Sequence, residues 1–323
     1  MFSMRIAVFV AAVLGVFSHE AAAQTYPTRS IKMVVGFAPG GPSDVMARLV
    51  GQRIAAALGQ PVVVDNRPGA GGTIGGRFVS ESEPDGYTLL LGNTSTLIVS
   101  PLIYKSIGYD PIKGFTPIAL LGTTADILIA NPKIPPNSIG ELIAYAKAHP
   151  GTLNYSSAGI GTPPHLIGEM FKQRAGLDIT HVPYKGGGPA IQAVITGEVQ
   201  FGFENPATAM PQIKQGSVKA LAVTSEERLP QLPNVPTMIE SGLADFAFVS
   251  FTGVIGPAGL PAPIVSRLNA VINEALKSPE LARTLENLAV DAKNETPPAF
   301  GAFLAKETAR LAPVIKAAGV KGE

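Results

Sequence analysis

The stretch IKMVVGFAPGGPSDVMARLVGQRIAAAL, residues 31–58, decides the fold of this chain. Its apolar beginning, 31–37, predicts a β-strand, and apolar residues at helical spacing over 43–58 predict a helix that ends at Gly59. The loop between them, 38–44, is rich in glycine and proline. A strand, a short loop and a helix in this order form one βα unit of an α/β protein.

The same alternation of strand and helix continues along the chain. Strands are predicted at 61–64, 87–91, 153–156, 179–183, 199–203 and 219–224, and helices at 163–174 and 189–195. Such alternation is typical of parallel βαβ units. We therefore expect an α/β protein with largely parallel sheets flanked by helices.

The length of the chain predicts two domains, and its character changes at two places. Gly122-Thr123-Thr124 interrupts an apolar region, and a polar, proline-rich stretch covers 226–236. The predicted crossings between lobes lie near 122–127 and 222–228, which gives a first lobe of residues 24–124 and 226–323 and a second lobe of residues 125–225. The C-terminal helices would complete the first lobe.

The N-terminus has the pattern of a secretory signal peptide. A positive beginning, Met1–Arg5, precedes an apolar run, Ile6–Phe17, which is too short to span a bilayer. Ala21-Ala22-Ala23 then gives a cleavage pattern of small residues. We expect residues 1–23 to be removed and the mature protein to reside in the periplasm.

Composition excludes several functions. The chain has no cysteine, 15% charged residues and a formal net charge of +1, so thiol catalysis, cysteine metal sites and a basic nucleic-acid surface are all disfavoured. The nucleophile motif Gly-x-Ser-x-Gly is missing, and His149, His165 and His181 do not follow metal-ligand spacing. We expect no enzymatic activity, no metal, no cofactor and no nucleic-acid partner.

The loop 38–44 combines glycine with a helix N-terminus. First-turn N–H groups have no partner within a helix, and the helix dipole is positive there, so such a loop favours a small anion. With Ser43 as the expected N-cap, the candidate donors are the N–H groups of Gly41, Ser43 and Asp44. Ordinary capping would also explain these residues, and the Asp44 carboxylate would oppose an anion.

The stretch 161–165, Gly-Thr-Pro-Pro-His, repeats this arrangement more than a hundred residues later. Thr162 is the expected N-cap and Pro163 fits the first helical position. The N–H groups of Gly159, Gly161 and Thr162 remain as candidate donors, and His165 either touches a ligand or packs at the helix start. Two such loops predict one ligand gripped from both sides.

In parallel α/β sheets, ligands bind beyond the carboxyl ends of the strands. The loops at these ends are rich in Gly, Ser, Thr and Asn and carry little charge. The predicted ligand-binding residues are Phe37, Ala38, Gly40, Gly41, Ser43, Asp44, Asn93, Thr94, Ser95, Ser157, Ala158, Gly159, Gly161, Thr162, His165, Tyr184, Lys185, Glu204 and Asn205.

A series of motifs carries a resemblance to a known family. They include Asn66-Arg67-Pro68-Gly69-Ala70-Gly71-Gly72, Pro84-Asp85-Gly86-Tyr87, Leu153-Asn154-Tyr155-Ser156-Ser157-Ala158-Gly159, His181-Val182-Pro183-Tyr184-Lys185-Gly186 and Pro233-Asn234-Val235-Pro236-Thr237. In this order they resemble the Bug-type extracytoplasmic receptors, the substrate-binding subunits of tripartite tricarboxylate transporters. The resemblance covers the whole mature chain.

The resemblance implies a two-lobed periplasmic-binding-protein fold of type II, closing on a small organic acid in a cleft between the lobes. It also implies transient contact with a membrane permease, and we expect a monomer. Signalling through a sensor kinase and an exported enzyme are the alternatives. Two departures concern the ligand: the family commonly has Asp-Asn where this chain has Glu204-Asn205, and often Trp near Phe251.

Overall fold

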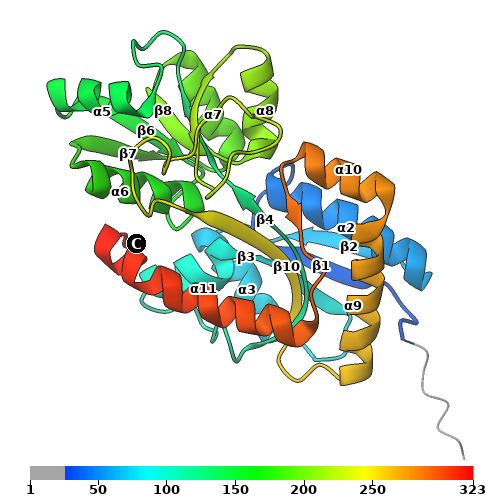
Figure 1. The fold of residues 1–323 in the computed structure, drawn as a ribbon. Helices are drawn as coiled ribbons and strands as arrows, with labels where there is room; N and C mark the ends of the chain where they lie inside the picture. The colour runs from blue at the N-terminus through cyan, green and yellow to red at the C-terminus, as the bar shows by residue number, and fades with distance from the viewer. Residues whose placement is uncertain (1–25, 323) are drawn as a thin grey trace, which may run out of the picture.

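The computed structural model describes residues 26–322 and folds them into two α/β lobes that lie side by side (Figure 1). Each lobe is built on one sheet flanked by helices. The α/β class and the two-lobed architecture are thus confirmed. The predicted signal peptide, residues 1–23, lies outside the described residues.

The first lobe contains a six-stranded sheet in the order β11-β4-β10-β3-β1-β2. Its strands are β1 (Ile31–Val35), β2 (Val62–Asn66), β3 (Thr88–Asn93), β4 (Phe115–Ala125), β10 (Val249–Pro257) and β11 (Asp291–Ala292). Its longer helices are α2 (Pro42–Leu58), α3 (Thr73–Ser80), α9 (Ala262–Lys277), α10 (Pro279–Asn287) and α11 (Pro297–Ala318), and its short ones are η1 (Ala70–Gly72), η2 (Ser95–Val99) and α4 (Ser100–Ile103).

The second lobe contains a five-stranded sheet in the order β7-β6-β8-β5-β9. Its strands are β5 (Ile127–Ala130), β6 (Leu153–Ser157), β7 (Ile179–Pro183), β8 (Phe201–Glu204) and β9 (Lys219–Val223). Its helices are α5 (Ile139–Ala148), α6 (Pro163–Ala175), α7 (Gly187–Thr196) and α8 (Pro206–Lys214).

Strand β1 shows how alternating residues build two cores on the first sheet. Successive side chains of a strand point to opposite faces. Ile31 and Met33 belong to the same buried cluster as apolar residues of α2 and α9, whereas Val34 belongs to a second cluster that includes Val79 of α3 and Phe300 of α11. Burying each such side chain contributes on the order of 2 kcal/mol to the hydrophobic free energy of folding.

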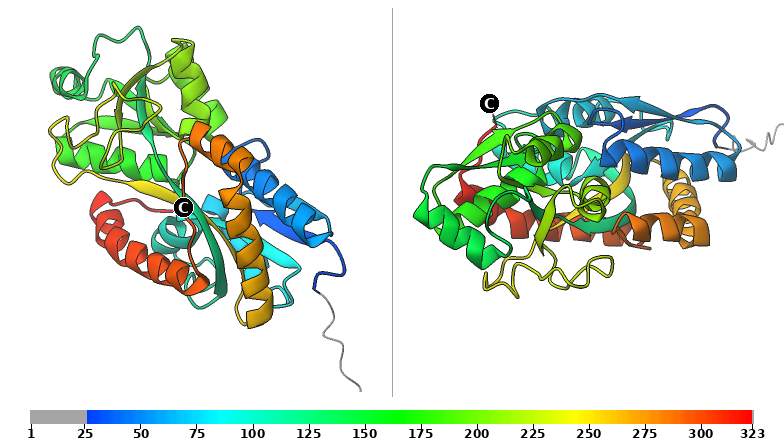
Figure 2. Two further views of the ribbon diagram at one scale, coloured as in Figure 1. Left: turned by 45° about the vertical axis from the view of Figure 1, so that its right-hand side comes forward. Right: turned by 90° about the horizontal axis from the view of Figure 1, so that it is seen from above.

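The sheets are mixed, which corrects the expectation of largely parallel sheets. In the first sheet β1 pairs in parallel with β2 and β3, but β10 pairs antiparallel with both β3 and β4. In the second, β6 is parallel to β7 and β8, but β5 is antiparallel to β8 and β9. The antiparallel pairing of β10 with β4 follows from the path of the chain. Strand β4 leaves the first lobe and its neighbour β10 returns to it, so the two run in opposite directions (Figure 2).

The two crossings lie at one place. Strand β4 continues through Gly122-Thr123-Thr124, because β10 pairs with it as far as Ala125 and Val249. The chain re-enters the first sheet with β10, which begins at Val249. The segment before it stays with the second lobe, where Leu229, Leu232 and Val235 pack against the core and Thr237 bridges to Val223.

Four backbone and hydroxyl contacts join the chain segments at these crossings. The N–H of Asp126 donates to Thr224 Oγ1 (2.9 Å), whose hydroxyl donates to the carbonyl of Phe248 (2.7 Å). In return Thr224 N–H donates to Asp126 O (2.9 Å) and Phe248 N–H donates to Thr224 O (2.7 Å). We call this cluster of Asp126, Thr224 and Phe248 the junction.

The sequence patterns did not predict several helices. Helix α8 contains Pro206 and Pro211, yet Asn205 caps it by accepting the N–H of Ala207 on Oδ1 (3.0 Å). The π-helical turn η2 and helix α4 follow β3 directly. Pro206 directly after Asn205 is a helix-start signal, because proline fits the first helical position.

The carboxyl group of Asp126 is buried in the junction, and its Oδ2 has no hydrogen-bond partner among the described residues. Burial raises the pKa of Asp126 to about 7, although a hydrogen bond from Ser250 lowers it in part. An aspartate in an unfolded chain has a pKa of about 3.9. Between these two values the folded protein holds a proton that the unfolded chain has lost, so this group's contribution to stability falls as pH rises.

We expect the stability of the variant Asp126→Asn, measured relative to the wild type, to be higher at pH 8 than at pH 5. The amide keeps the size of the side chain and cannot ionise. Between the two pH values, therefore, only the wild type loses the contribution of this carboxyl group to the free energy of unfolding. The melting temperature of the variant minus that of the wild type should increase by about 5 °C from pH 5 to pH 8. This value assumes that each kcal/mol of stability shifts the melting temperature by about 2–4 °C.

Thermal unfolding at pH 5 and pH 8, followed by circular dichroism, measures this difference. The control is Asp178→Asn, which removes an exposed carboxylate of the second lobe. Equal differences at both pH values for Asp126→Asn would contradict the assignment of a buried, protonated carboxyl.

Candidate functional site

The loops that were predicted to bind the ligand, at the carboxyl ends of the strands, face each other across the two lobes. Strands β1 and β3 are parallel, and so are β6 and β8, so the loops after them gather at one edge of each sheet. Ser95 after β3 donates from Oγ to the carbonyl of Gly161 after β6 (2.6 Å). This hydrogen bond brings the two edges together.

In loop 36–44, Asp44 organises the backbone. Its carboxylate accepts the Gly40 N–H (3.0 Å), two N–H groups of Arg48 (2.9 and 3.0 Å) and one of Asn66 (3.0 Å). The hydrogen bonds from Arg48 are the main cause of a pKa lowered to about 2. The negative charge that seemed to oppose an anion is therefore paired with Arg48.

The helix after this loop starts earlier than predicted. Gly41 is the N-cap of α2 and Pro42 its first residue, and the Ser43 hydroxyl accepts a hydrogen bond from Asn93 Nδ2 (3.2 Å). Among the described residues, the N–H groups of Gly41, Ser43 and Asp44 find no protein acceptor. These three N–H groups are the ones that were predicted from the sequence as hydrogen-bond donors to an anion in this loop.

The loop 157–165 differs from expectation in its free donors. The N–H groups of Gly159, Gly161 and Thr162 all have protein acceptors, namely Ser157 Oγ, His165 Nδ1 and the carbonyl of Gly159. Thr162 is the N-cap of α6 as predicted, but its hydroxyl donates to Gly159 O (2.6 Å) and makes no capping bond. The N–H groups of Ala158 and Ile160 are left without acceptors in the described part of the chain.

Asn93 and Thr94 are tied into the first lobe. Asn93 Oδ1 accepts the N–H of Thr96 (3.0 Å), and Thr94 Oγ1 accepts the N–H of Phe251 (2.8 Å). Phe251, the position where relatives often carry Trp, is itself buried. Its ring therefore acts in the core between β10 and α11, where it contacts Phe300 edge to face.

Glu204 ends β8 with its side chain 1% exposed. Its Oε2 accepts the hydroxyl of Thr208 (3.1 Å), and its Oε1 has no partner in the described residues. Burial, together with the neighbouring Asp126, holds the pKa of Glu204 well above its usual range. Burial thus favours the uncharged form of this carboxyl, which repels a nearby carboxylate less than the ionised form would.

Some predicted residues lie apart from these contacts. The hydroxyl of Tyr184 donates to Glu198 (2.8 Å), beyond the end of α7, and Lys185 is exposed. Ala38 and Gly40 are exposed at the tip of their loop, and the Phe37 carbonyl accepts Asn66 Nδ2 (3.0 Å). Asn205 uses its side-chain oxygen to cap α8.

Two residues missed by the sequence reasoning belong to the same region. His181 on β7 lies with Nε2 2.7 Å from Ser157 Oγ, and Asp126 adjoins Glu204. The strand pattern 179–183 placed His181 beside the predicted strand 153–156, and that pairing was the one available signal. For Asp126 no signal existed, because its burial depends on where the chain crosses between lobes.

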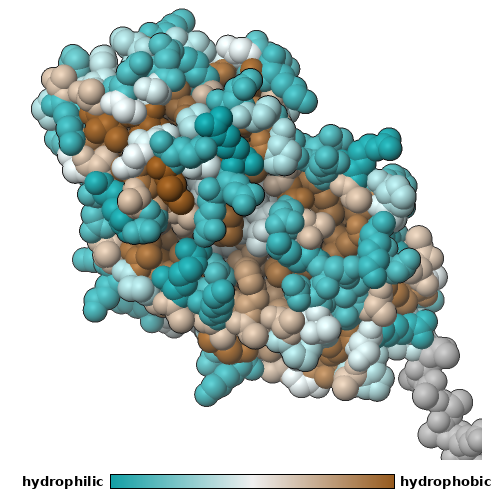
Figure 3. All heavy atoms as spheres, viewed as in Figure 1, coloured by the Kyte–Doolittle hydropathy of each residue, from teal (hydrophilic) through white to brown (hydrophobic). Residues whose placement is uncertain are grey.

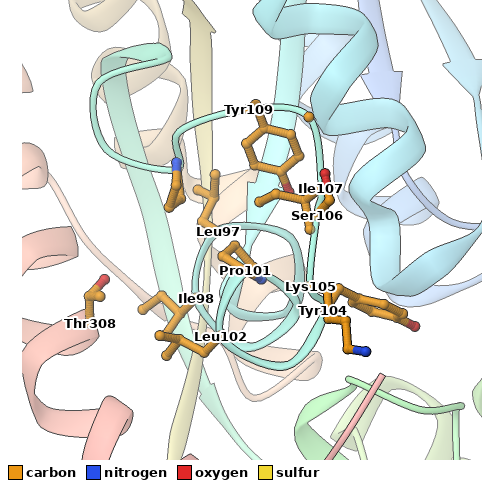
Figure 4. Close-up of a pocket in the computed structure, with 12 residues that line it drawn as sticks. Leu97, Ile98, Pro101, Leu102, Tyr104, Lys105, Ser106, Ile107, Tyr109 and Thr308 are labelled. Carbon is orange, nitrogen blue, oxygen red and sulfur yellow. The ribbon is translucent and has the colours of Figure 1, made fainter. Parts of the chain in front are cut away.

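A pocket of about 360 Å³ lies behind η2 on the first lobe, away from the predicted loops (Figure 4). Its walls are mainly apolar and include Leu97, Ile98 and Tyr109. The Tyr109 hydroxyl donates to the carbonyl of Thr96 (2.6 Å). This wall holds the helical turn that starts at Ser95.

Hydrophobic residues on the face in Figure 3 appear as small areas separated by hydrophilic ones.

Within residues 26–322, no helix has the length and apolar character needed to cross a bilayer. Among the same residues, no three acidic or histidine side chains gather as metal ligands.

Comparison with known proteins agrees with this geometry. The family model described as tripartite tricarboxylate transporter family receptor matches residues 46–320. BugT of Bordetella pertussis is 38% identical over 317 residues, which cover 96% of this chain and 97% of BugT.

Solved structures extend the likeness to the whole fold. Rpa4515 of R. palustris, solved with adipate, has a TM-score of 0.88 at 33% identity and covers 92% of this chain and 99% of its own. MatC (Rpa3494) from Rhodopseudomonas palustris, solved with bound malate, has a TM-score of 0.84 at 34% identity and covers 90% and 100%.

These findings confirm the resemblance seen in the motifs, and with it the prediction of a solute-binding receptor without enzymatic activity. The chain belongs to the tripartite tricarboxylate transporter receptor family, which includes the Bug proteins.

Proposed function

We propose that this chain is a periplasmic receptor that closes its two lobes on a small dicarboxylate and delivers it to a tripartite tricarboxylate-type permease. The observation that carries the proposal is the hydrogen bond from Ser95 Oγ to Gly161 O, which joins the strand-end loops of the two lobes. The relatives solved with adipate and malate support a dicarboxylate as the ligand.

Free backbone donors would hold the carboxylates. On the first lobe these are the N–H groups of Gly41, Ser43 and Asp44, and on the second those of Ala158 and Ile160. The nearby acids oppose an anion little, because Asp44 is paired with Arg48 and burial favours the uncharged form of Glu204. Preorganised dipoles of this kind bind an anion without a cationic side chain.

The motion would take place about the junction. We propose a first lobe of residues 26–125 and 249–322 and a second lobe of residues 126–248, with the later boundary moved from 225 because Leu229, Leu232 and Val235 pack on the second lobe. The signal peptide over residues 1–23, secretion to the periplasm and a monomeric state complete the proposal.

Calorimetric titration with adipate and malate tests the function. We expect at least one of them to bind, and the uncharged diester dimethyl adipate not to bind, because the proposed donors recognise carboxylate oxygens. Absence of binding by both acids, or equal binding of the diester, would contradict a carboxylate receptor.

A wedge at Gly161 should weaken binding by holding the lobes apart. A Cβ at Gly161 would lie 2.9 Å from Ile103 Cδ1 and 3.2 Å from Ser100 Oγ, both in the first lobe. Gly161→Leu should therefore lower the affinity for the bound acid by about tenfold or more, equivalent to about 1.4 kcal/mol.

The matched control is Gly176→Leu, because Gly176 also has a positive φ (62°, against 77° at Gly161) and has nothing within 4 Å of its Cβ position. Both variants should lose similar thermal stability from the left-handed backbone, on the order of 1–2 kcal/mol. Equal affinities of the two variants would refute the closing contact at Gly161.

Lys185→Met tests whether a charge holds the ligand. Lys185 is exposed at the rim of the second lobe, and none of the described residues forms an ion pair with it. We expect the affinity to change by less than about threefold, since an exposed charge contributes little. A hundredfold loss in calorimetric titration would show that a cation, and not the backbone dipoles, holds the carboxylate.

A further inference from the structure

Two histidines hold the binding loop of the second lobe at both of its ends. At the first end, Ser157 Oγ lies 2.7 Å from His181 Nε2 and also accepts the N–H of Gly159 (3.1 Å). At the second end, His165 Nδ1 accepts the N–H of Gly161 (3.4 Å). The loop between Ser157 and Gly161 therefore takes its shape partly from imidazole groups.

The two imidazoles also hold each other. His165 and His181 stack face to face with ring centroids 3.9 Å apart and an interplanar angle of 8°. Tyr155, the register partner of His181 on β6, also stacks on His181, with ring centroids 4.9 Å apart. The stack links α6, β7 and β6 behind the loop, so a shift of one ring would move the others.

The surroundings favour uncharged rings. Burial lowers the pKa of His181 to about 3, and His165 and Lys172 lower it further. Burial also lowers the pKa of His165, although Glu169, which accepts the Tyr155 hydroxyl (2.7 Å), acts in the opposite direction. A neutral imidazole keeps one nitrogen as an acceptor, and the Gly161 N–H bond requires such an acceptor at His165 Nδ1.

We propose that His181, with its stacking partner His165, is a positioning residue that fixes loop 157–161 in the form that binds the ligand. The inference rests on the proposed function, because it assigns the loop's free N–H groups of Ala158 and Ile160 to a ligand carboxylate. The histidines themselves do not touch the ligand in this scheme. They act through Ser157 and Gly161.

Two substitutions separate the hydrogen bond from the stack. His181→Phe keeps a flat ring in the stack and removes one partner of Ser157, whose Oγ also donates to the Gly159 carbonyl (3.2 Å). His181→Gln removes the ring and keeps a side chain whose amide can reach the Ser157 hydroxyl. The control is His149→Phe, since His149 is also stacked on a tyrosine (Tyr145, 4.3 Å) and lies far from the loop in the α5 region.

The first readout needs no ligand. Amide hydrogen exchange of Gly159 and Gly161, followed by NMR at neutral pH, should speed up about tenfold in His181→Phe, because Ser157 Oγ loses its contact with His181 and keeps only its two hydrogen bonds to the Gly159 backbone. It should stay within about threefold of wild type in His181→Gln and in His149→Phe. Unchanged exchange in His181→Phe, or no rescue by His181→Gln, would overturn the proposal.

The second readout is calorimetric titration with adipate and malate as probes. The affinity of whichever acid the wild type binds should fall about tenfold in His181→Phe and recover in His181→Gln. Failure of the wild type to bind either acid would count against the proposed function alone, since the exchange experiment tests the positioning role without a ligand. Normal affinity in His181→Phe would refute the positioning role.

Discussion

The junction is the constraint on which the rest of the structure depends. The chain leaves the first lobe on β4 and returns on β10, and these two strands are paired as far as Ala125 and Val249. Beyond that pair, Thr224 joins Asp126 to Phe248 through four hydrogen bonds. Because the chain crosses between the lobes at one place, the proposed closure would take place about that place and bring the strand-end loops together.

Apart from the exposed Lys185, the ionisable groups discussed around those loops are either paired or held where their uncharged form is favoured. Asp44 is paired with Arg48, Glu204 and Asp126 are buried where the uncharged form is favoured, and the stacked histidines are neutral. Most hydrogen bonds of the loop residues point inward, as in Thr162 to Gly159 and Asn66 to Asp44. What remains for a ligand is a small set of backbone N–H groups, which suits an anion held by dipoles.

Local patterns predicted the βα units, because strand and helix periodicities and proline at the first helical position act within a few residues. Helix α6 begins at Pro163 and its N-cap is Thr162, as the sequence indicated. The expectation of largely parallel sheets did not foresee the antiparallel pairing of β10 and β5, because strand direction depends on where the chain crosses between lobes, and local periodicity carries no such information. The free donors after β6 were also wrong, since Ser157, His165 and a turn at Gly159 take up the N–H groups expected to be free.

The most direct test of the account is a disulfide across the closing contact. The chain has no cysteine, and a Cβ at Gly161 would lie 3.2 Å from Ser100 Oγ, a separation that a disulfide can bridge with little movement. The double variant Ser100→Cys with Gly161→Cys should therefore cross-link under mild oxidation, and faster when adipate or malate is bound, because the ligand favours the closed arrangement. A cross-linking rate that does not change at saturating ligand would contradict the closure of the two lobes on the acid.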